Sequence, residues 1–229
     1  MFKELSLQAT YSSYEDDIGA AFYSPVLAES VKYDRATAYF SAKALASYSK
    51  GIEHFAQSCH SIRLIVSVEL SHEDYETIKL GYELRESINT MLVKRLHEKL
   101  SLEEERGISN LAFLISIGVI DIRIAFTAER SFHDKFGIVK DSASELICFL
   151  GFNNEADAAY EANYESFDIT SSWKASAFDY AKITKSQETF DKLWNNKADG
   201  VCVRQISDVV YQEISRFNKG RLITDTLQL

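Results

Sequence analysis

The sequence is poor in the residues that separate a chain into independent pieces. Of its 229 residues, only one is proline (Pro25) and nine are glycine. Linkers between domains are usually rich in proline, glycine or polar residues, and no stretch of this chain has that composition. Repeats and low-complexity tracts are also missing. We therefore expect one compact domain, since the chain is long enough to bury a substantial core.

Cysteine is scarce as well. The three cysteines, Cys59, Cys148 and Cys202, lie far apart and form no CxxC pair, and the five histidines are scattered. This pattern argues against a structural zinc site, and an odd, sparse cysteine count fits a reducing compartment. We expect neither a metal nor a cofactor.

Long hydrophobic runs are missing too. No window approaches the roughly 20 apolar residues of a membrane span. The N-terminal stretch MFKELSLQATYSSYEDD has no apolar core of the length found in signal peptides. These absences predict a cytoplasmic protein.

Positive charge is in deficit. The chain has 25 lysines and arginines against 34 acidic residues, a net charge of −9. Proteins that grip nucleic acid usually present a basic face. A nucleic-acid substrate therefore requires that positive charge be focused in one groove or supplied by a partner.

The spacing of apolar residues predicts alternating helices and strands. The expected helices are 14–30, with Pro25 in a first helical turn, then 43–57, 72–81, 84–106, 108–117, 174–194 and 207–217. The expected strands are 33–41, 61–68, 120–126, 132–140, 145–151, 163–170 and 201–206. Strand–helix–strand units followed by clustered strands indicate an α/β fold, a mixed β-sheet flanked by helices.

The stretch from His133 to Trp173 carries the residues with chemical potential. His133 and Lys135 are two apart at the head of an expected strand, so their side chains share a face while Asp134 points the opposite way. A nucleophilic imidazole beside a fixed cation suits attack on a phosphodiester. An isolated His-x-Lys is weak evidence, because a lone histidine is more often a surface or core residue.

The turn GFNN follows one strand later. In the simplest interpretation it only connects strands, since Gly151 and the two asparagines tolerate left-handed backbone geometry. Alternatively, the Asn154 amide donates a hydrogen bond to a phosphoryl oxygen while Gly151 lets the backbone approach closely.

Glu165 lies on the next expected strand, in NYESFDI. It is either an exposed strand residue or the acceptor for one imidazole nitrogen of His133. In the second case it fixes the tautomer, so that the other nitrogen can attack.

Together these residues resemble the HKD motif of the phospholipase D superfamily, and they are most similar to its nuclease-like branch in prokaryotic restriction and helicase systems. The resemblance also includes the upstream stretches FYSPVLAESVKYDRATAYFS and IRLIVSVELSHEDYETIKLGY and the downstream FDKLWNN, within residues 15–197. It implies a nuclease domain over 1–200, with a helical insertion at about 84–117. Residues 201–229 are then a C-terminal extension that packs on this domain or leads to a partner.

The resemblance assigns roles to seven residues. It implies four catalytic residues, His133, Lys135, Asn154 and Glu165, and three supporting ones, Asp141, Gly151 and Asn153. The chain departs from the superfamily pattern at two places. Lys140 stands where the motif usually has aspartate, with Asp141 one residue later, and Phe152 replaces the usual serine of the Gly-Ser turn.

Only one His-x-Lys is present, whereas the superfamily's site uses two facing histidines. The resemblance therefore implies a homodimer with the site on its two-fold axis. The implied function is metal-independent cleavage of DNA through a phosphohistidine in a restriction or anti-phage system, with a helicase or ATPase as a possible partner. Two alternatives stay open: a catalytically weakened nucleic-acid-binding or assembly subunit, and a phospholipase or phosphatidyl transferase. The sequence has no segment typical of an amphipathic membrane-binding helix, which counts against the phospholipase alternative.

Overall fold

A computed structural model of the chain describes residues 1–12, 14–37, 42, 52–55, 61–67, 86–97, 99–127, 132, 134–151 and 166–225. An eight-stranded mixed sheet forms its centre, in the order β1-β7-β6-β5-β2-β3-β4-β8. The strands are β1 (Thr10–Ser12), β2 (Ser30–Ala36), β3 (Ser61–Ser67), β4 (Ile120–Thr127), β5 (Phe136–Asp141), β6 (Leu146–Gly151), β7 (Ser166–Ser171) and β8 (Val201–Gln205).

The sheet is parallel in its middle and antiparallel on both sides. Strands β2, β3 and β4 run parallel, as expected of strands joined by crossover connections. Strands β5, β6, β7 and β1 add antiparallel pairs on one side, and β8 pairs antiparallel with β4 on the other. The α/β mixed sheet expected from the sequence is confirmed.

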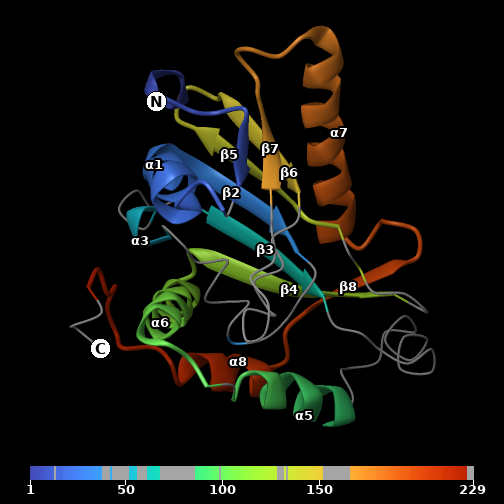
Figure 1. Cartoon of the computed structure of the whole chain (residues 1–229). Coiled ribbons are helices and arrows are strands. Elements are labelled where there is room, and N and C mark those ends of the chain that lie inside the picture. The colour runs from blue at the N-terminus through green and yellow to red at the C-terminus, as the bar shows by residue number, and fades with distance from the viewer. Residues whose placement is uncertain are drawn as a thin grey trace.

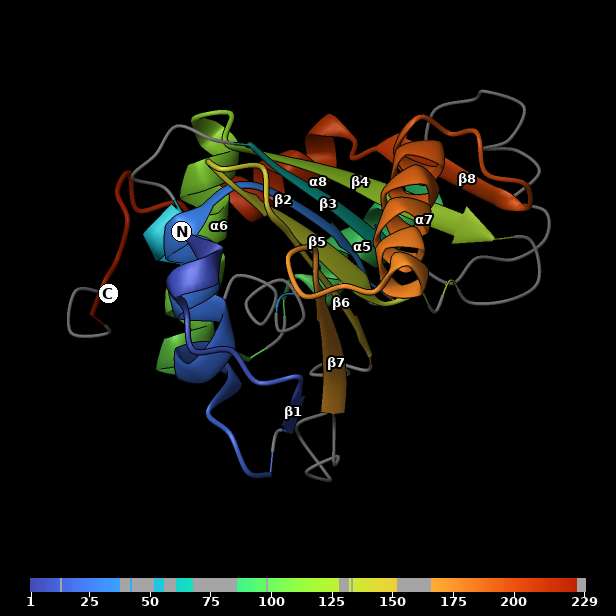
Figure 2. The ribbon, with the colours of Figure 1, turned by 90° about the horizontal axis from the view of Figure 1, so that it is seen from above.

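Helices cover both faces of this sheet (Figures 1 and 2). They comprise η1 (Phe2–Glu4), the π-helical turn η2 (Gly19–Tyr23), α1 (Ser24–Glu29), α3 (Ile52–Phe55), α5 (Glu86–Arg95), α6 (Leu102–Ser116), α7 (Ala177–Trp194) and α8 (Asp208–Ser215). Helices α1, α3, α5, α6 and α8 contribute to one core on what we call the α1 face. Helix α7 covers the opposite α7 face, where it contacts β2, β5, β6 and β8.

Alternation along the strands separates the two cores. In β3, Ile62, Leu64 and Val66 join the α1 face, whereas Ile65 joins the α7 face. The α1-face core includes a cluster of rings around Phe22, whose centroid is 5.0–5.3 Å from those of Tyr11, Tyr23, Phe149 and Phe167. This cluster lies directly under β6 and β7.

The expected helix over 84–106 is wrong. Helix α5 ends at Arg95, and a separate helix α6 begins after the N-cap Ser101. The Ser101 hydroxyl accepts from the Glu104 N–H while the Glu104 carboxylate accepts from the Ser101 N–H, a capping box that starts a new helix. Apolar spacing continues through the break, because Leu92 and Leu96 before it and Ile108 after it all reach the α1-face core.

Several other boundaries differ from expectation. Strand β2 begins at Ser30 rather than at 33, and β5 begins at Phe136, after the stretch expected to start it at 132. The expected helix 14–30 starts as the π-helical turn η2 and continues as α1, with Pro25 in the first turn. The expected helix 72–81 lies outside the described residues. In the described part of the chain, no helix is long and apolar enough to cross a membrane.

Candidate active site

The three motif segments converge on one end of three adjacent strands. Lys135 immediately precedes β5, Gly151 ends β6 and Ser166 begins β7. The Gly151 N–H donates a hydrogen bond to the Lys135 carbonyl (3.3 Å), and Gly151 is in register with Phe167 of β7. The structure thus brings together Lys135 and Gly151 of the expected site. His133, Asn153, Asn154 and Glu165 lie outside the described residues.

Strand alternation assigns this neighbourhood to the α1 face. Phe136 and Ile138 belong to the α7-face core, whereas Val139 belongs to the α1-face core. Lys135 is two residues before Gly137, so it shares the α1 face. Lys135 is only 7% exposed, so its side chain is held in place by the groups packed around it.

A second buried cation lies on the neighbouring strand. Arg35 of β2 is paired with Gly137 and is 3% exposed. Its guanidinium donates to the Tyr23 hydroxyl (3.3 Å) and lies 5.0 Å from the centre of the Phe149 ring. Two basic side chains are therefore buried on one face, at one end of the sheet, in a chain whose net charge is −9.

Thr37 completes this end of β2. Because Ala36 pairs with Phe136, Thr37 stands opposite Lys135. It is fully buried, its N–H donates to the Ile65 carbonyl (2.9 Å), and its Oγ1 has no hydrogen-bond partner among the described residues. A buried hydroxyl without a partner is unusual, and here it lies beside the motif lysine.

Two glycines of the motif segments are required by close packing. A side chain at Gly137 would place its Cβ 2.0 Å from Phe149 Cζ, so the ring rests on the bare glycine backbone. Gly151 has a φ of +153°, and a Cβ there would lie 2.6–2.7 Å from the Phe167 Cβ and Cα and the Ser166 carbonyl. The close approach expected at Gly151 is therefore made to the backbone of β7.

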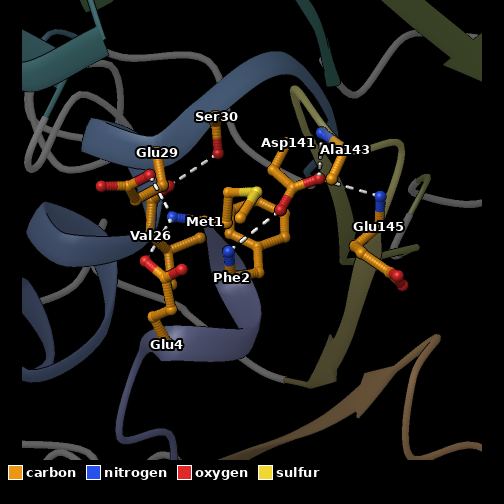
Figure 3. Close-up of polar contacts among 9 residues, drawn as sticks. All are labelled: Met1, Phe2, Glu4, Val26, Glu29, Ser30, Asp141, Ala143 and Glu145. Atoms are coloured by element: carbon orange, nitrogen blue, oxygen red, sulfur yellow. Dashed lines mark hydrogen bonds and ion pairs between the residues drawn. The ribbon is translucent and has the colours of Figure 1, made fainter.

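Asp141 lies at the opposite end of β5 from Lys135. Its Oδ1 accepts from the Ala143 and Glu145 N–H groups (3.0 and 2.9 Å), and its Oδ2 accepts from the Phe2 N–H (2.9 Å), as Figure 3 shows. The residue is 1% exposed. Its support is structural, because it closes the β5–β6 turn and fastens the N-terminal segment to that turn.

Sequence reasoning missed Arg35 and Thr37. Both belong to the stretch YDRATAYFS, which the sequence predicts as a strand and which is part of the family resemblance, but neither residue has a predicted role. The available signal was the set of charged residues, Lys32, Asp34 and Arg35, in a strand expected at the centre of the sheet, since charged residues are rarely buried without a partner. Within the part of the chain that the structure describes, no group of His, Cys, Asp and Glu side chains is placed to hold a metal ion.

The chain was compared with known proteins. No protein-family model and no curated protein matches its sequence. Among solved structures, NucT from Helicobacter pylori is similar over 81% of this chain and 94% of its own length, at 15% identity and a TM-score of 0.44.

Two larger proteins are similar to the chain over part of their length. Polyphosphate kinase from Porphyromonas gingivalis matches 86% of this chain but only 27% of its own, at 13% identity and a TM-score of 0.44. Phosphatidylserine synthase from Haemophilus influenzae matches 90% of this chain and 40% of its own, at 12% identity and a TM-score of 0.46. The α/β class of this chain is set by its own eight-stranded sheet and covering helices.

Proposed function

We propose that the chain is a metal-independent phosphodiesterase of the phospholipase D kind, a DNA endonuclease that works as a homodimer. One observation carries the proposal: Lys135, Gly151 and Ser166, which adjoin the other motif residues in sequence, lie at one end of β5, β6 and β7. The buried cations Lys135 and Arg35 lie at that end. A phosphodiester is an anion, and its transition state gains negative charge on the phosphoryl oxygens, so this arrangement suits it.

The reaction follows from the residue types. His133 of one protomer attacks phosphorus and forms a P–N bond, while the P–O bond to the leaving group breaks. The partner's His133, protonated, gives its proton to the leaving oxygen. That histidine then takes a proton from water, whose oxygen attacks phosphorus and breaks the P–N bond.

The remaining residues assist this exchange. Lys135 and Asn154 donate hydrogen bonds to the phosphoryl oxygens, and Glu165 holds the His133 tautomer. No step uses a metal, because the lysines supply the positive charge. A role in restriction or anti-phage defence, with a helicase or ATPase partner, rests on the sequence resemblance.

The test is cleavage of labelled single- and double-stranded DNA in EDTA. Wild type should cut, and His133→Ala should lose at least ~10³-fold in rate, since the change removes both nucleophile and acid. Lys135→Met should lose about 10²–10³-fold. His97→Ala is the matched control and should be unchanged, because His97 is exposed and contacts Glu213. Activity abolished by EDTA, together with a fully active His133→Ala, would overturn the mechanism.

Mixing protomers tests the shared site. If each site needs both histidines, an equal mixture of wild type and His133→Ala that exchanges freely should keep about one quarter of the activity. Independent protomers would keep about one half. The second result would remove the dimer from the proposal and leave the chemistry.

A second candidate function is a nucleic-acid-binding or assembly subunit without catalysis. Phe152 in place of the usual serine and the net charge of −9 favour it. Equal DNA binding by wild type and His133→Ala, with no cleavage by either, would support this candidate. A phosphatidylcholine vesicle in the same assay tests the lipid alternative.

A further inference from the structure

A groove of about 470 Å³ lies between α7 and the site ends of β5 and β6. Phe136 and Leu150 line its sheet side, Phe178, Lys182 and Lys185 line its helix side, and Asp134 lines one end. Its volume is in the range of small-molecule sites. The groove belongs to the α7 face, as Phe136 belongs to the α7-face core.

The groove begins one residue from the proposed phosphodiester site. Asp134 separates the two motif residues His133 and Lys135, and it lines the groove while Lys135 belongs to the α1 face. Partial desolvation raises the pKa of the Asp134 carboxyl, although the residue as a whole is exposed.

The groove presents apolar surface to solvent. Phe178 is 73% exposed and Leu150 is 44% exposed. Lys182 Nζ lies 4.9 Å from the centre of the Phe178 ring, and this cation–π contact orients the ring. The same nitrogen lies 3.0 Å from Asp179 Oδ1. A large exposed aromatic beside apolar floor residues is a platform for a flat, unpaired ring.

The lysines of the groove are available to anions. Lys182 pairs with Asp179, and Lys185 lies 3.9 Å from Glu188, both as exposed i,i+3 pairs. Such surface pairs contribute little stability and exchange readily. In a chain of net charge −9, two lysines along an apolar groove favour a ligand that combines a ring with phosphate.

We propose that this groove holds an unpaired nucleobase of single-stranded DNA a few nucleotides from the scissile phosphodiester, because Phe178 lies about three turns of α7 from Phe190, which packs on Phe136. Phe178 stacks on the base, and Lys182 and Lys185 contact the adjoining phosphates. The inference rests on the proposed function for the position of the scissile phosphate. A paired base cannot present its face to Phe178, so the groove selects single strands over duplex.

Binding is measured by fluorescence anisotropy in EDTA, with a labelled single-stranded 20-mer and full-length protein carrying His133→Ala to prevent cleavage. Adding Phe178→Ala should weaken binding about tenfold, the usual loss for one stacking contact. The pair Lys182→Gln and Lys185→Gln should weaken binding and lower the salt slope by about 1.4, for two lost phosphate contacts. Tyr180→Ala and Lys192→Gln are matched controls, since both are exposed on α7 outside the groove, and should bind unchanged.

An abasic site placed at each position of the 20-mer in turn identifies the base that stacks on Phe178. With one base removed at successive positions of the 20-mer, the wild-type KM should rise about tenfold at one position a few nucleotides from the cut. In Phe178→Ala the same abasic substrate should behave like the intact one, because the stacking partner is already gone. This double change separates stacking from a general loss of affinity.

Three results would overturn the inference. They are equal binding by Phe178→Ala and Tyr180→Ala, duplex bound as tightly as single strand, and conversion of a dimer to a monomer by Phe178→Ala, which would make the groove a subunit interface.

The two proposals fail separately. Suppose that Phe178→Ala and one abasic position weaken binding, but that wild type never cleaves DNA. The groove inference then holds and the phosphodiesterase proposal fails. In that case the Kd of each abasic 20-mer is measured in place of KM. If bis(p-nitrophenyl) phosphate is hydrolysed with dependence on His133 while Phe178→Ala leaves 20-mer binding unchanged, the reverse is true.

Discussion

The two faces of the sheet are held by different interactions. The α1 face is held mainly by apolar residues from several helices and by a cluster of rings that meet mostly edge-on or tilted. The α7 face is covered by one helix, attached by a small apolar patch and by charged groups. Arg63 of β3 donates two 2.7 Å bonds to Asp34 and one of 2.9 Å to Asp191 of α7, and its guanidinium lies over the Phe190 and Trp194 rings.

This difference separates stability from recognition. The α1-face core runs under the motif end of β5, β6 and β7 and fixes the backbone there. Helix α7 buries Ile183, Phe190, Leu193 and Trp194 on one side, while Phe178, Lys182 and Lys185 are exposed on another side and line the groove. We infer that the first face sets the geometry of the candidate site and the second adapts to what binds beside it.

The largest expected effect is on the α1 face. Phe22→Ala should lower the free energy of unfolding by about 3–5 kcal/mol, because it empties the centre of the ring cluster. Urea denaturation measures the change. Leu102→Ala is the control, since Leu102 is 63% exposed, and it should change stability by less than about 0.5 kcal/mol. Equal effects would show that the rings are not the main core.

An intermediate effect is expected where α7 is anchored. Asp34→Asn should cost about 2 kcal/mol, because it leaves the half-buried Arg63 guanidinium without its bidentate carboxylate. Asp191→Asn, with a side chain 56% exposed, should cost less than about 1 kcal/mol. Hydrogen exchange should quicken in α7 and stay slow in α6. Uniform exchange in both helices would mean that the two faces open together.

The smallest effect is expected at Arg123. Its guanidinium lies 4.0 Å from the centre of the Trp194 ring and donates to the Trp194 carbonyl (2.6 Å). Arg123→Met should cost about 1 kcal/mol and change the fluorescence of Trp194. Arg123→Lys should recover part of the loss, since it keeps the charge without the planar donor group. No recovery would assign the effect to the carbonyl hydrogen bond alone.

Sequence patterns predicted most of the sheet because buried strands can be recognised as short apolar runs. SIRLIVS and IDIRIAFT became β3 and β4 nearly residue for residue. The break between α5 and α6 was missed because both helices bury residues in the same core, so apolar spacing continued across it. The capping box of Ser101 and Glu104 was the local signal that outweighed this spacing.

The candidate site was only partly readable for a similar reason. Lys135 and Gly151 are near each other in sequence, and their strands form a hairpin, so their proximity followed from local order. Arg35 and Thr37 join them through the pairing of β2 with β5, a contact between segments about 100 residues apart that no local pattern specifies. The groove could not be predicted from the sequence, because it depends on how α7 packs against β5 and β6.

The contact between Gly137 and the Phe149 ring means that these two paired positions can be substituted only together. The ring fills the volume that any side chain at Gly137 would need, and it also carries the Arg35 guanidinium. A graft of the HDKFG segment into another sheet therefore has to bring an aromatic residue on the adjacent strand and the arginine beyond it. A smaller residue at position 149 would remove the ring contact of the Arg35 guanidinium. A larger residue at position 137 would fit only if the Phe149 ring were also replaced.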